Sequence, residues 1–168
     1  AAVLVAPGGE IWVADGHRGG NNRVMKFSAD GELLLQLGGG VDDTSRESGR
    51  FNDPHDLKMD SQGRLFVADR GNNRIQIFDQ AGELLDIWTQ FGRPSGLWID
   101  ADDRLYAADG MSGEQWNRGW ERGIRIGDAR SGYVTEFIPD YEVQSGSGIE
   151  FLAADRDGNV FAGQGGRQ

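Results

Sequence analysis

The segment PHDLKMDSQGRLFVADRGNNRIQIFDQAGELLDIW, residues 54–88, determines the fold that we expect. Apolar and polar residues alternate through four short runs, which are separated by turn residues at Gly63, Asn72 and Gly82. Alternation with a period of two is typical of β-strands, and glycine or asparagine between such runs is typical of tight turns. The segment therefore predicts four antiparallel strands that follow one another along the chain.

The same pattern recurs before and after this segment. The second strand of each copy ends at Asp15, Asp69, Asp109 or Gly163, and these positions are 54, 40 and 54 residues apart. A unit of about 40 residues is the size of one four-stranded propeller blade. The spacing therefore predicts a run of blades, two of which are followed or interrupted by inserts.

We predict an all-β fold in which the whole chain, 1–168, forms one partial β-propeller of four-stranded antiparallel blades. The inserts span 39–50 and 111–122. The blades are expected at about 1–38, 52–90 and 93–139, with a partial blade at 146–168. Identical units placed side by side bury each sheet face on its neighbour, which favours a propeller over a sandwich.

The chain is acidic and has no cysteine. It has 168 residues and a formal net charge of −10, with a sequence pI of about 4.6. Nucleic-acid binding normally needs a basic stripe, and an anionic membrane attracts runs of lysine and arginine, so we expect neither as a partner. The lack of cysteine excludes disulfides and thiolate metal sites. No apolar run approaches the roughly 18 residues that a membrane-spanning helix needs.

The amino-acid sequence of the repeat resembles that of the NHL family. The pattern Pro-x-x-Leu-x-x-Asp-x-x-Gly-x-Leu-x-Val-Ala-Asp-x-x-Asn-x-Arg-Ile-x-x-Phe is complete from Pro54 to Phe78. NHL propellers usually have six blades, so the resemblance implies that about three and a half blades here belong to a six-bladed ring. Because the chain starts at Ala1 inside an expected strand, we expect further sequence before it. The ring would be completed by such sequence or by a second copy, and a homodimer is the arrangement that we predict.

The unusual residues are expected to gather on one face of the propeller, around the mouth of its axis. This face carries the connections between blades and the connections between the second and third strand of each blade. Loops that vary in length are the usual place for function. The candidate ligand-binding residues at this mouth are His55, Arg70, Arg18, Trp116 and Trp120.

A second resemblance concerns the segments 13–28, 49–55 and 67–70, which are similar to the propeller of peptidyl-α-hydroxyglycine α-amidating lyases. That family holds zinc with three histidines and breaks a C–N bond with help from a tyrosine and an arginine. The likeness implies that His55 is a zinc ligand, that Arg70 and His17 are catalytic, and that Glu150 lies near the position of another ligand. The chain has only two histidines, and catalytic zinc generally needs three protein ligands. A third ligand would have to come from a partner or from missing sequence.

Calcium is the other metal considered, since Asp42 and Asp43 form a pair of oxygen donors. No loop has the spacing of a dedicated calcium site.

Each candidate also has a structural explanation. His55 could cap an inner strand and bond a neighbouring blade, His17 could be an exposed loop residue, and Arg74 is expected to pair with acidic residues of an adjacent blade. The aspartates that recur at the end of the second strand are expected to make structural hydrogen bonds. Trp116 and Trp120 could stack on a ligand or seal a blade interface.

Three functions follow from these observations. The favoured one is a binding or interaction module that holds a peptide, a carbohydrate, another small molecule or a protein at the mouth. The alternatives are a metal-dependent lyase-like enzyme, complete only with further sequence or a partner, and assembly by stacking of blades. The fold does not decide among them. The compartment stays open, with export slightly favoured by the NHL resemblance.

Overall fold

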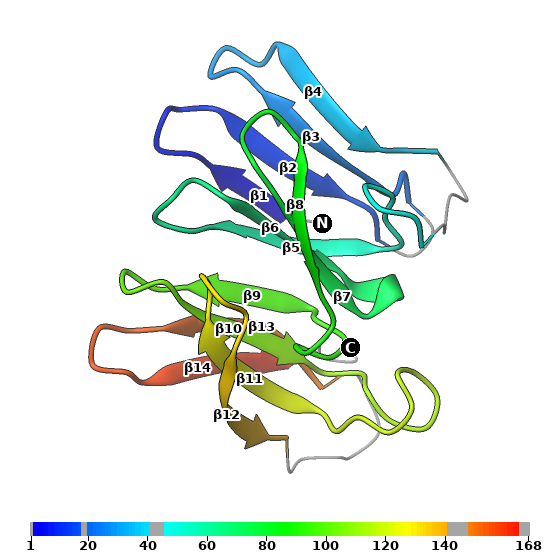
Figure 1. The fold of residues 1–168 in the computed structure, drawn as a ribbon, viewed down its shortest axis with the longest axis vertical. Coiled ribbons are helices and arrows are strands. Elements are labelled where there is room, and N and C mark those ends of the chain that lie inside the picture. Colours follow the sequence, from blue (N-terminus) through cyan, green and yellow to red (C-terminus); the bar gives the residue numbers. More distant parts are fainter. Residues whose placement is uncertain (1, 18–19, 41–45, 141–147, 165–168) are drawn as a thin grey trace.

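The computed structural model describes residues 2–17, 20–40, 46–140 and 148–164. Within these ranges the chain forms three four-stranded antiparallel sheets and one two-stranded sheet (Figure 1). The first sheet contains β1 (Ala2–Val5), β2 (Ile11–Asp15), β3 (Arg23–Phe27) and β4 (Leu33–Gly38). The second contains β5 (Pro54–Met59), β6 (Leu65–Asp69), β7 (Arg74–Phe78) and β8 (Leu84–Trp88). The third contains β9 (Gly96–Ile99), β10 (Arg104–Asp109), β11 (Gly123–Asp128) and β12 (Val134–Pro139), and the two-stranded sheet pairs β13 (Ile149–Ala154) with β14 (Val160–Gln164).

The sheets are arranged as successive blades around an axis. The first strand of each sheet contacts the first strand of the next, so that β1, β5, β9 and β13 follow one another along the axis, whereas β4, β8 and β12 lie outside. The prediction of an all-β fold made of four-stranded antiparallel blades is confirmed. The one helix in the described ranges is a three-residue 3₁₀ turn, η1 (Arg70–Asn72). No described helix is long and apolar enough to cross a membrane.

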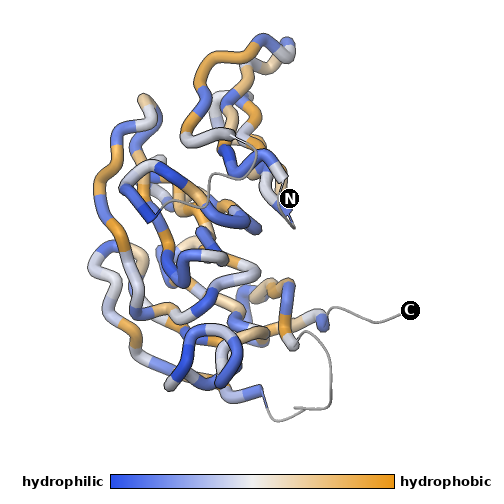
Figure 2. Tube along the Cα trace, turned by 90° about the vertical axis from the view of Figure 1, so that its right-hand side faces the viewer, coloured by the Kyte–Doolittle hydropathy of each residue, from blue (hydrophilic) through white to orange (hydrophobic). Residues whose placement is uncertain are grey.

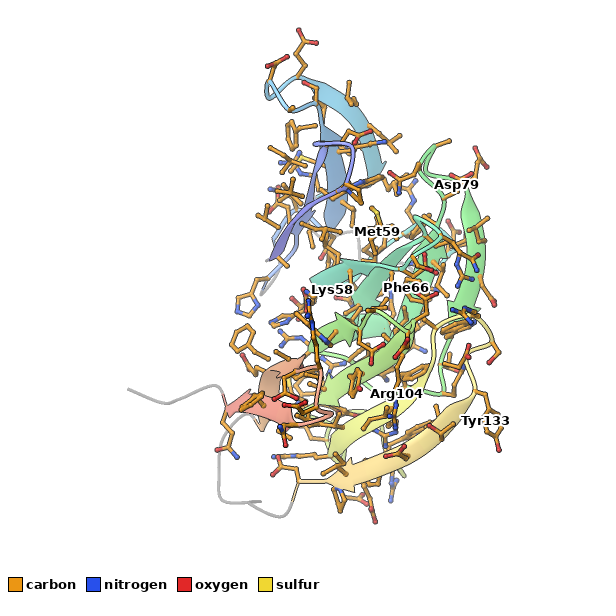
Figure 3. The ribbon with its side chains drawn as sticks, turned by 90° about the vertical axis from the view of Figure 1, so that its left-hand side faces the viewer. Lys58, Met59, Phe66, Asp79, Arg104 and Tyr133 are labelled. Atoms are coloured by element: carbon orange, nitrogen blue, oxygen red, sulfur yellow. The ribbon has the colours of Figure 1, made fainter. Side chains whose placement is uncertain are left out.

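The blades bury apolar side chains on both faces, and Figure 2 shows how hydrophobic (orange) and hydrophilic (blue) residues follow one another along the chain. Successive side chains of a strand point to opposite sides of its sheet. In the second blade, Leu65 and Val67 therefore pack toward the first blade, whereas Phe66 and Ala68 pack toward the third. In Figure 3, Met59 belongs to the core between the first and second blades, and Phe66 belongs to the core between the second and third. Burial on both faces explains why the middle strands of this blade read as nearly continuous apolar runs.

An aspartate at the end of the second strand closes each of the three four-stranded blades, and it is fully buried in the second and third. Asp69 accepts hydrogen bonds from Asn72 and from the Arg74 guanidinium, at 2.9 and 2.6 Å. It also accepts one from the backbone N–H of Asn52, at 2.7 Å, in the segment that enters the blade. Burial raises the pKa of Asp69, although these bonds oppose the shift. The structural role that we expected for this residue is thus observed.

The other two aspartates repeat the arrangement. Asp15 accepts from Asn21 and Arg23 at 2.8 and 2.9 Å. Asp109 accepts from Ser112 Oγ at 2.6 Å and from Arg125 at 3.1 Å. The blades therefore share one connection, in which a carboxylate joins the loop that follows its strand to a cation on the next strand.

One expectation about this cluster was wrong. Arg74 pairs with Asp69 of its own blade, and not with an acidic residue of an adjacent blade. The remaining guanidinium hydrogens reach the first insert, where Nη1 donates to the carbonyl of Arg46 and Nη2 donates to the carbonyls of Glu47 and Arg50. The physical reason is register, because Asp69 and Arg74 are directly paired positions of β6 and β7.

Equivalent arginines in two blades allow a matched test of this interaction. We expect Arg74→Met to lower the free energy of unfolding by about 3–5 kcal/mol, since it leaves a buried carboxylate without its cation. In the first blade the side chains of Arg23 and Asp15 are 32% and 31% exposed, whereas those of Arg74 and Asp69 are 8% and 0% exposed. Arg23→Met should therefore cost at most about 1 kcal/mol. Urea denaturation of both variants measures the difference, and equal losses would contradict this account.

Candidate functional site

Three connections of the first two blades meet at the mouth of the axis. His17 follows β2, Asp53 precedes β5, and Arg70 follows β6. The Arg70 guanidinium donates from Nε and Nη2 to Asp53 Oδ2, at 2.9 and 2.6 Å. His17 Nδ1 lies 3.8 Å from Asp53 Oδ1 and 3.5 Å from Arg70 Nη2. The structure thus brings together both residues that we predicted to be catalytic, with Asp53 between them.

Local backbone features fix this arrangement. Asp53 has a φ of +58°, a conformation that asparagine and aspartate tolerate better than most residues. Its N–H donates to Asn22 Oδ1 at 2.9 Å, which ties the entry of the second blade to the first. Gly71 N–H donates to the carbonyl of Asn52 at 2.7 Å. A Cβ at Gly71 would lie 2.4 Å from the Asn52 side chain, so only glycine allows this approach.

His55 stands at the start of the inner strand β5 and is only 6% exposed. Its Nδ1 lies 2.7 Å from the carbonyl oxygen of Ser95 in the third blade. Because a carbonyl only accepts, Nδ1 carries the proton and Nε2 presents a lone pair in the neutral ring. Burial lowers the pKa of His55, and Arg70 lowers it further, against the opposing effect of the Ser95 carbonyl. The hydrogen bond to a neighbouring blade, which was the structural explanation for His55, is therefore present.

Arg93 also belongs to the mouth, and the sequence analysis missed it. It is 7% exposed, and its Nη1 donates to the Arg70 carbonyl and to Asn73 Oδ1, both at 2.9 Å. Its Nε is buried without a hydrogen-bond partner, and no carboxylate in the described ranges forms an ion pair with it. Burial lowers the pKa of Arg93 and Arg70 lowers it further, whereas the Asp53 and Asp109 carboxylates oppose the shift. Arg93 precedes Pro94 as Asp53 precedes Pro54, and an alignment of these two repeats could have identified Arg93.

The two candidate tryptophans of the second insert contact arginines. The Trp116 ring lies 5.0 Å from the Arg93 guanidinium carbon and is 43% exposed. The Trp120 ring lies 4.7 Å from that of Arg125, which pairs with Asp109. Cations attract the faces of aromatic rings, so each tryptophan holds the insert against its own blade. Trp116 covers Arg93 at the mouth, while Trp120 belongs to the Asp109 cluster.

The remaining candidates fall into two groups. Arg18, Asp42 and Asp43 lie outside the described residues. Glu150 is half-buried on β13, and it is absent from the lining of the pocket beside His55. The described ranges contain no group of three histidine, aspartate or glutamate residues that could hold a metal ion. The donor set present around His55 therefore does not fit a catalytic zinc by itself, and such a site still needs a donor from outside these ranges.

A pocket of about 210 Å³ lies on the axis beside His55. It is lined by all four inner strands, which contribute Ala2, His55, Trp98 and Phe151 among others. The His55 ring centroid lies 5.3 Å from that of His17 and 6.5 Å from that of Phe151. The pocket thus connects the charged mouth with the interior of the axis.

A larger hollow of about 800 Å³ lies near the opposite turns of the third and fourth sheets, where Asp100 and Asp155 line it. Both carboxylates accept hydrogen bonds from backbone N–H groups of their own turns, and so they stabilise those turns. We therefore place the candidate site at the mouth.

The effect of Arg70 on His55 can be measured. We expect the pKa of His55 to lie below its ordinary value of 6.5 and to rise in Arg70→Met, because the cation that disfavours imidazolium is removed. Since the folded pKa is lowered, neutral His55 contributes stability above pH 6.5 that is lost as the pH falls below it. A ¹H–¹⁵N titration of the imidazole gives the pKa, with Arg156→Met, an exposed arginine on a distant turn, as the control. A fall of the pKa in Arg70→Met would refute the assignment.

Comparison with known proteins supports the blade assignment. Residues 51–78 match the model of the NHL repeat. Human NHL repeat-containing protein 3 is 44% identical over 89 residues, which cover 52% of this chain and 24% of that protein. Peptidyl-glycine alpha-amidating monooxygenase B of Xenopus laevis is 31% identical over 170 aligned positions, covering 92% of this chain and 18% of that protein. The chain thus spans about a quarter or less of the length of these relatives.

Solved structures agree on the fold. A streptogramin B lyase structure superposes with a TM-score of 0.64 at 15% identity, covering 96% of this chain and 47% of that one. The WD40 repeats of RRP9 give a TM-score of 0.63, also at 15% identity, over 90% of this chain and 40% of that one. At such low identity the likeness concerns the fold alone. With its NHL repeat and its successive four-stranded blades, the chain is a stretch of an NHL-repeat β-propeller.

Proposed function

We propose that this chain is the ligand-binding part of an NHL-repeat propeller and that its mouth holds a peptide or small molecule by a carboxylate group. The observation that carries the proposal is Arg93, a buried cation whose Nε has no hydrogen-bond partner and which forms no ion pair among the described residues. A buried charge is costly unless an opposite charge neutralises it. A ligand carboxylate would provide that neutralisation.

The surroundings of Arg93 support an anionic ligand. Arg70 and Asp53 neutralise each other, and so Arg93 leaves an excess of positive charge in a chain whose net charge is −10. Guanidinium groups bind carboxylates through two parallel hydrogen bonds. The half-exposed Trp116 ring covers Arg93, so movement of one side chain would open the group to a ligand.

Calorimetric titration with N-acetylglycine tests this function, with N-acetylglycinamide as the uncharged control ligand. We expect the carboxylate to bind and the amide to bind more weakly. Arg93→Met should weaken binding about 10- to 100-fold, since hydrogen bonds to charged groups are worth about 1.5–3 kcal/mol. Arg156→Met, on the turn between β13 and β14, should leave it unchanged. Equal binding of acid and amide would exclude a carboxylate site.

A second candidate function is a zinc-dependent lyase. It is favoured by the similarity to peptidyl-glycine alpha-amidating monooxygenase B over 92% of this chain and by the proximity of His17, Arg70 and His55. Elemental analysis of the same preparation separates the two functions. Stoichiometric zinc that is lost in His55→Ala would favour the lyase, whereas the binding module requires no metal.

We also propose that a second copy of the chain packs against the ends of the arc. The first blade exposes Val3 and Val5, at 66% and 64%, and the fourth sheet exposes Phe151 and Phe161, at 61% and 60%. Bare apolar sheet faces of this kind are association surfaces. They support a homodimer through these faces.

Light scattering tests the homodimer, for which we expect about twice the chain mass of 18.3 kDa. Phe161→Glu should shift the mass toward that of the monomer, because a carboxylate would be buried in the interface. Leu85→Glu, an exposed position on the outer strand β8, serves as the control. A monomeric parent chain would rule the homodimer out.

A further inference from the structure

We propose that the axial pocket beside His55 binds one uncharged sugar ring. The inference concerns a different set of groups from the carboxylate site at Arg93 and does not depend on it. The pocket volume of about 210 Å³ equals that of roughly seven liquid water molecules. This is below the range of about 300–1,000 Å³ found for drug-sized ligands, so the occupant is small.

Ser95 provides the first reason to expect a ligand. Its backbone is fully bonded, because its N–H donates to the Ala108 carbonyl at 2.7 Å and its carbonyl accepts from His55. Ser95 lines the pocket, and its completely buried side chain leaves Oγ without a hydrogen-bond partner. A buried hydroxyl without a partner costs free energy, and a ligand hydroxyl would remove that cost.

Two further groups add complementary hydrogen-bonding capacity. His55 presents the Nε2 lone pair, which accepts, and no described residue donates to it. Trp98 also lines the pocket, and its Nε1 donor is buried without a partner. His55 Nε2 is an acceptor, Trp98 Nε1 is a donor, and Ser95 Oγ both donates and accepts. A ligand with hydroxyl groups on neighbouring carbon atoms matches this set, because each hydroxyl also donates and accepts.

The charge of the pocket selects a neutral ligand. Lys58 Nζ donates to both carboxylate oxygens of Asp56, at 3.0 and 3.2 Å, and these two charges neutralise each other. Asp56 Oδ2 also accepts from Leu97 N–H at 2.8 Å. Both side chains line the pocket but are held by each other and by the adjacent inner strand, so neither offers an unpaired charge.

The rest of the wall is apolar. Phe151 and Leu152 of β13 line the side contributed by the fourth sheet, together with Ala2 of β1. A sugar ring has a polar edge of hydroxyl groups and faces made of C–H bonds, which pack favourably on an aromatic ring. The combination of unpaired donors and acceptors with an apolar wall and no net charge therefore fits a sugar better than an ion or a hydrocarbon.

Saturation-transfer NMR and calorimetry of the 168-residue chain test the proposal. The probes are D-glucose, D-galactose, D-mannose and D-xylose, with N-methylacetamide and acetate as non-sugar probes. We expect at least one sugar to bind more tightly than either non-sugar probe. Ser95→Ala should weaken its binding about 3- to 10-fold, the loss expected for one neutral hydrogen bond.

Stability measurements separate a binding role from a structural one. Ser95→Ala should leave thermal unfolding unchanged or slightly raise the midpoint, because Oγ makes no bond within the protein. Phe151→Ala should weaken sugar binding through the apolar wall, and Ser131→Ala, on an exposed turn, should change neither quantity. Absence of sugar binding, tighter binding of N-methylacetamide or acetate, or sugar binding unaltered in both Ser95→Ala and Phe151→Ala would overturn the proposal.

Discussion

The structure depends on the carboxylate at the end of the second strand of each four-stranded blade. Asp69 fixes the loop that follows β6 through Asn72, the next strand through Arg74, and the entering segment through Asn52. A carboxylate accepts several hydrogen bonds at once, which no apolar residue can replace. The entering segment, the loop after β6 and the start of β7 therefore meet at one carboxylate, at the end of the blade that faces the mouth.

The candidate site is built directly on this connection. Asn22 and Asn73 both adopt a left-handed backbone conformation just before the third strand. Each uses its side-chain oxygen to hold the start of the next blade, Asn22 through the Asp53 N–H and Asn73 through the Arg93 guanidinium. Asp53 and Arg93, which lead into the inner strands of the second and third blades, are thus held at equivalent places. An aspartate there neutralises Arg70, whereas an arginine there leaves an excess positive charge.

Much of this could be predicted from local pattern. The strands, the turns and the size of the repeat follow from alternation and spacing, because a four-stranded blade is formed by residues that are close in sequence. The convergence of His17, Arg70 and His55 at one mouth also follows, since His17 and Arg70 come directly after second strands and His55 begins an inner strand at the same face. Arg93 and Ser95 occupy the positions of Asp53 and His55 in the next blade, but sequence alone does not show that Arg93 forms no ion pair or that the Ser95 hydroxyl has no hydrogen-bond partner. Arg74 was assigned to the wrong blade because the pairing depends on strand register.

By itself, the sequence determined that the chain folds into antiparallel blades that stack side by side, because the periods of two and of about 40 residues are local properties. Only the tertiary structure decided which polar groups find partners. His55 bonds the third blade through Nδ1, and Ser95 lines the same pocket with a buried hydroxyl that has no partner. Burial and hydrogen bonding depend on neighbours from other blades, and those neighbours lie 20 to 40 residues away in the chain for Arg93, Asp53 and His55. The repeat spacing therefore predicts the fold, whereas the hydrogen bonding of the groups around the axis depends on how the blades pack.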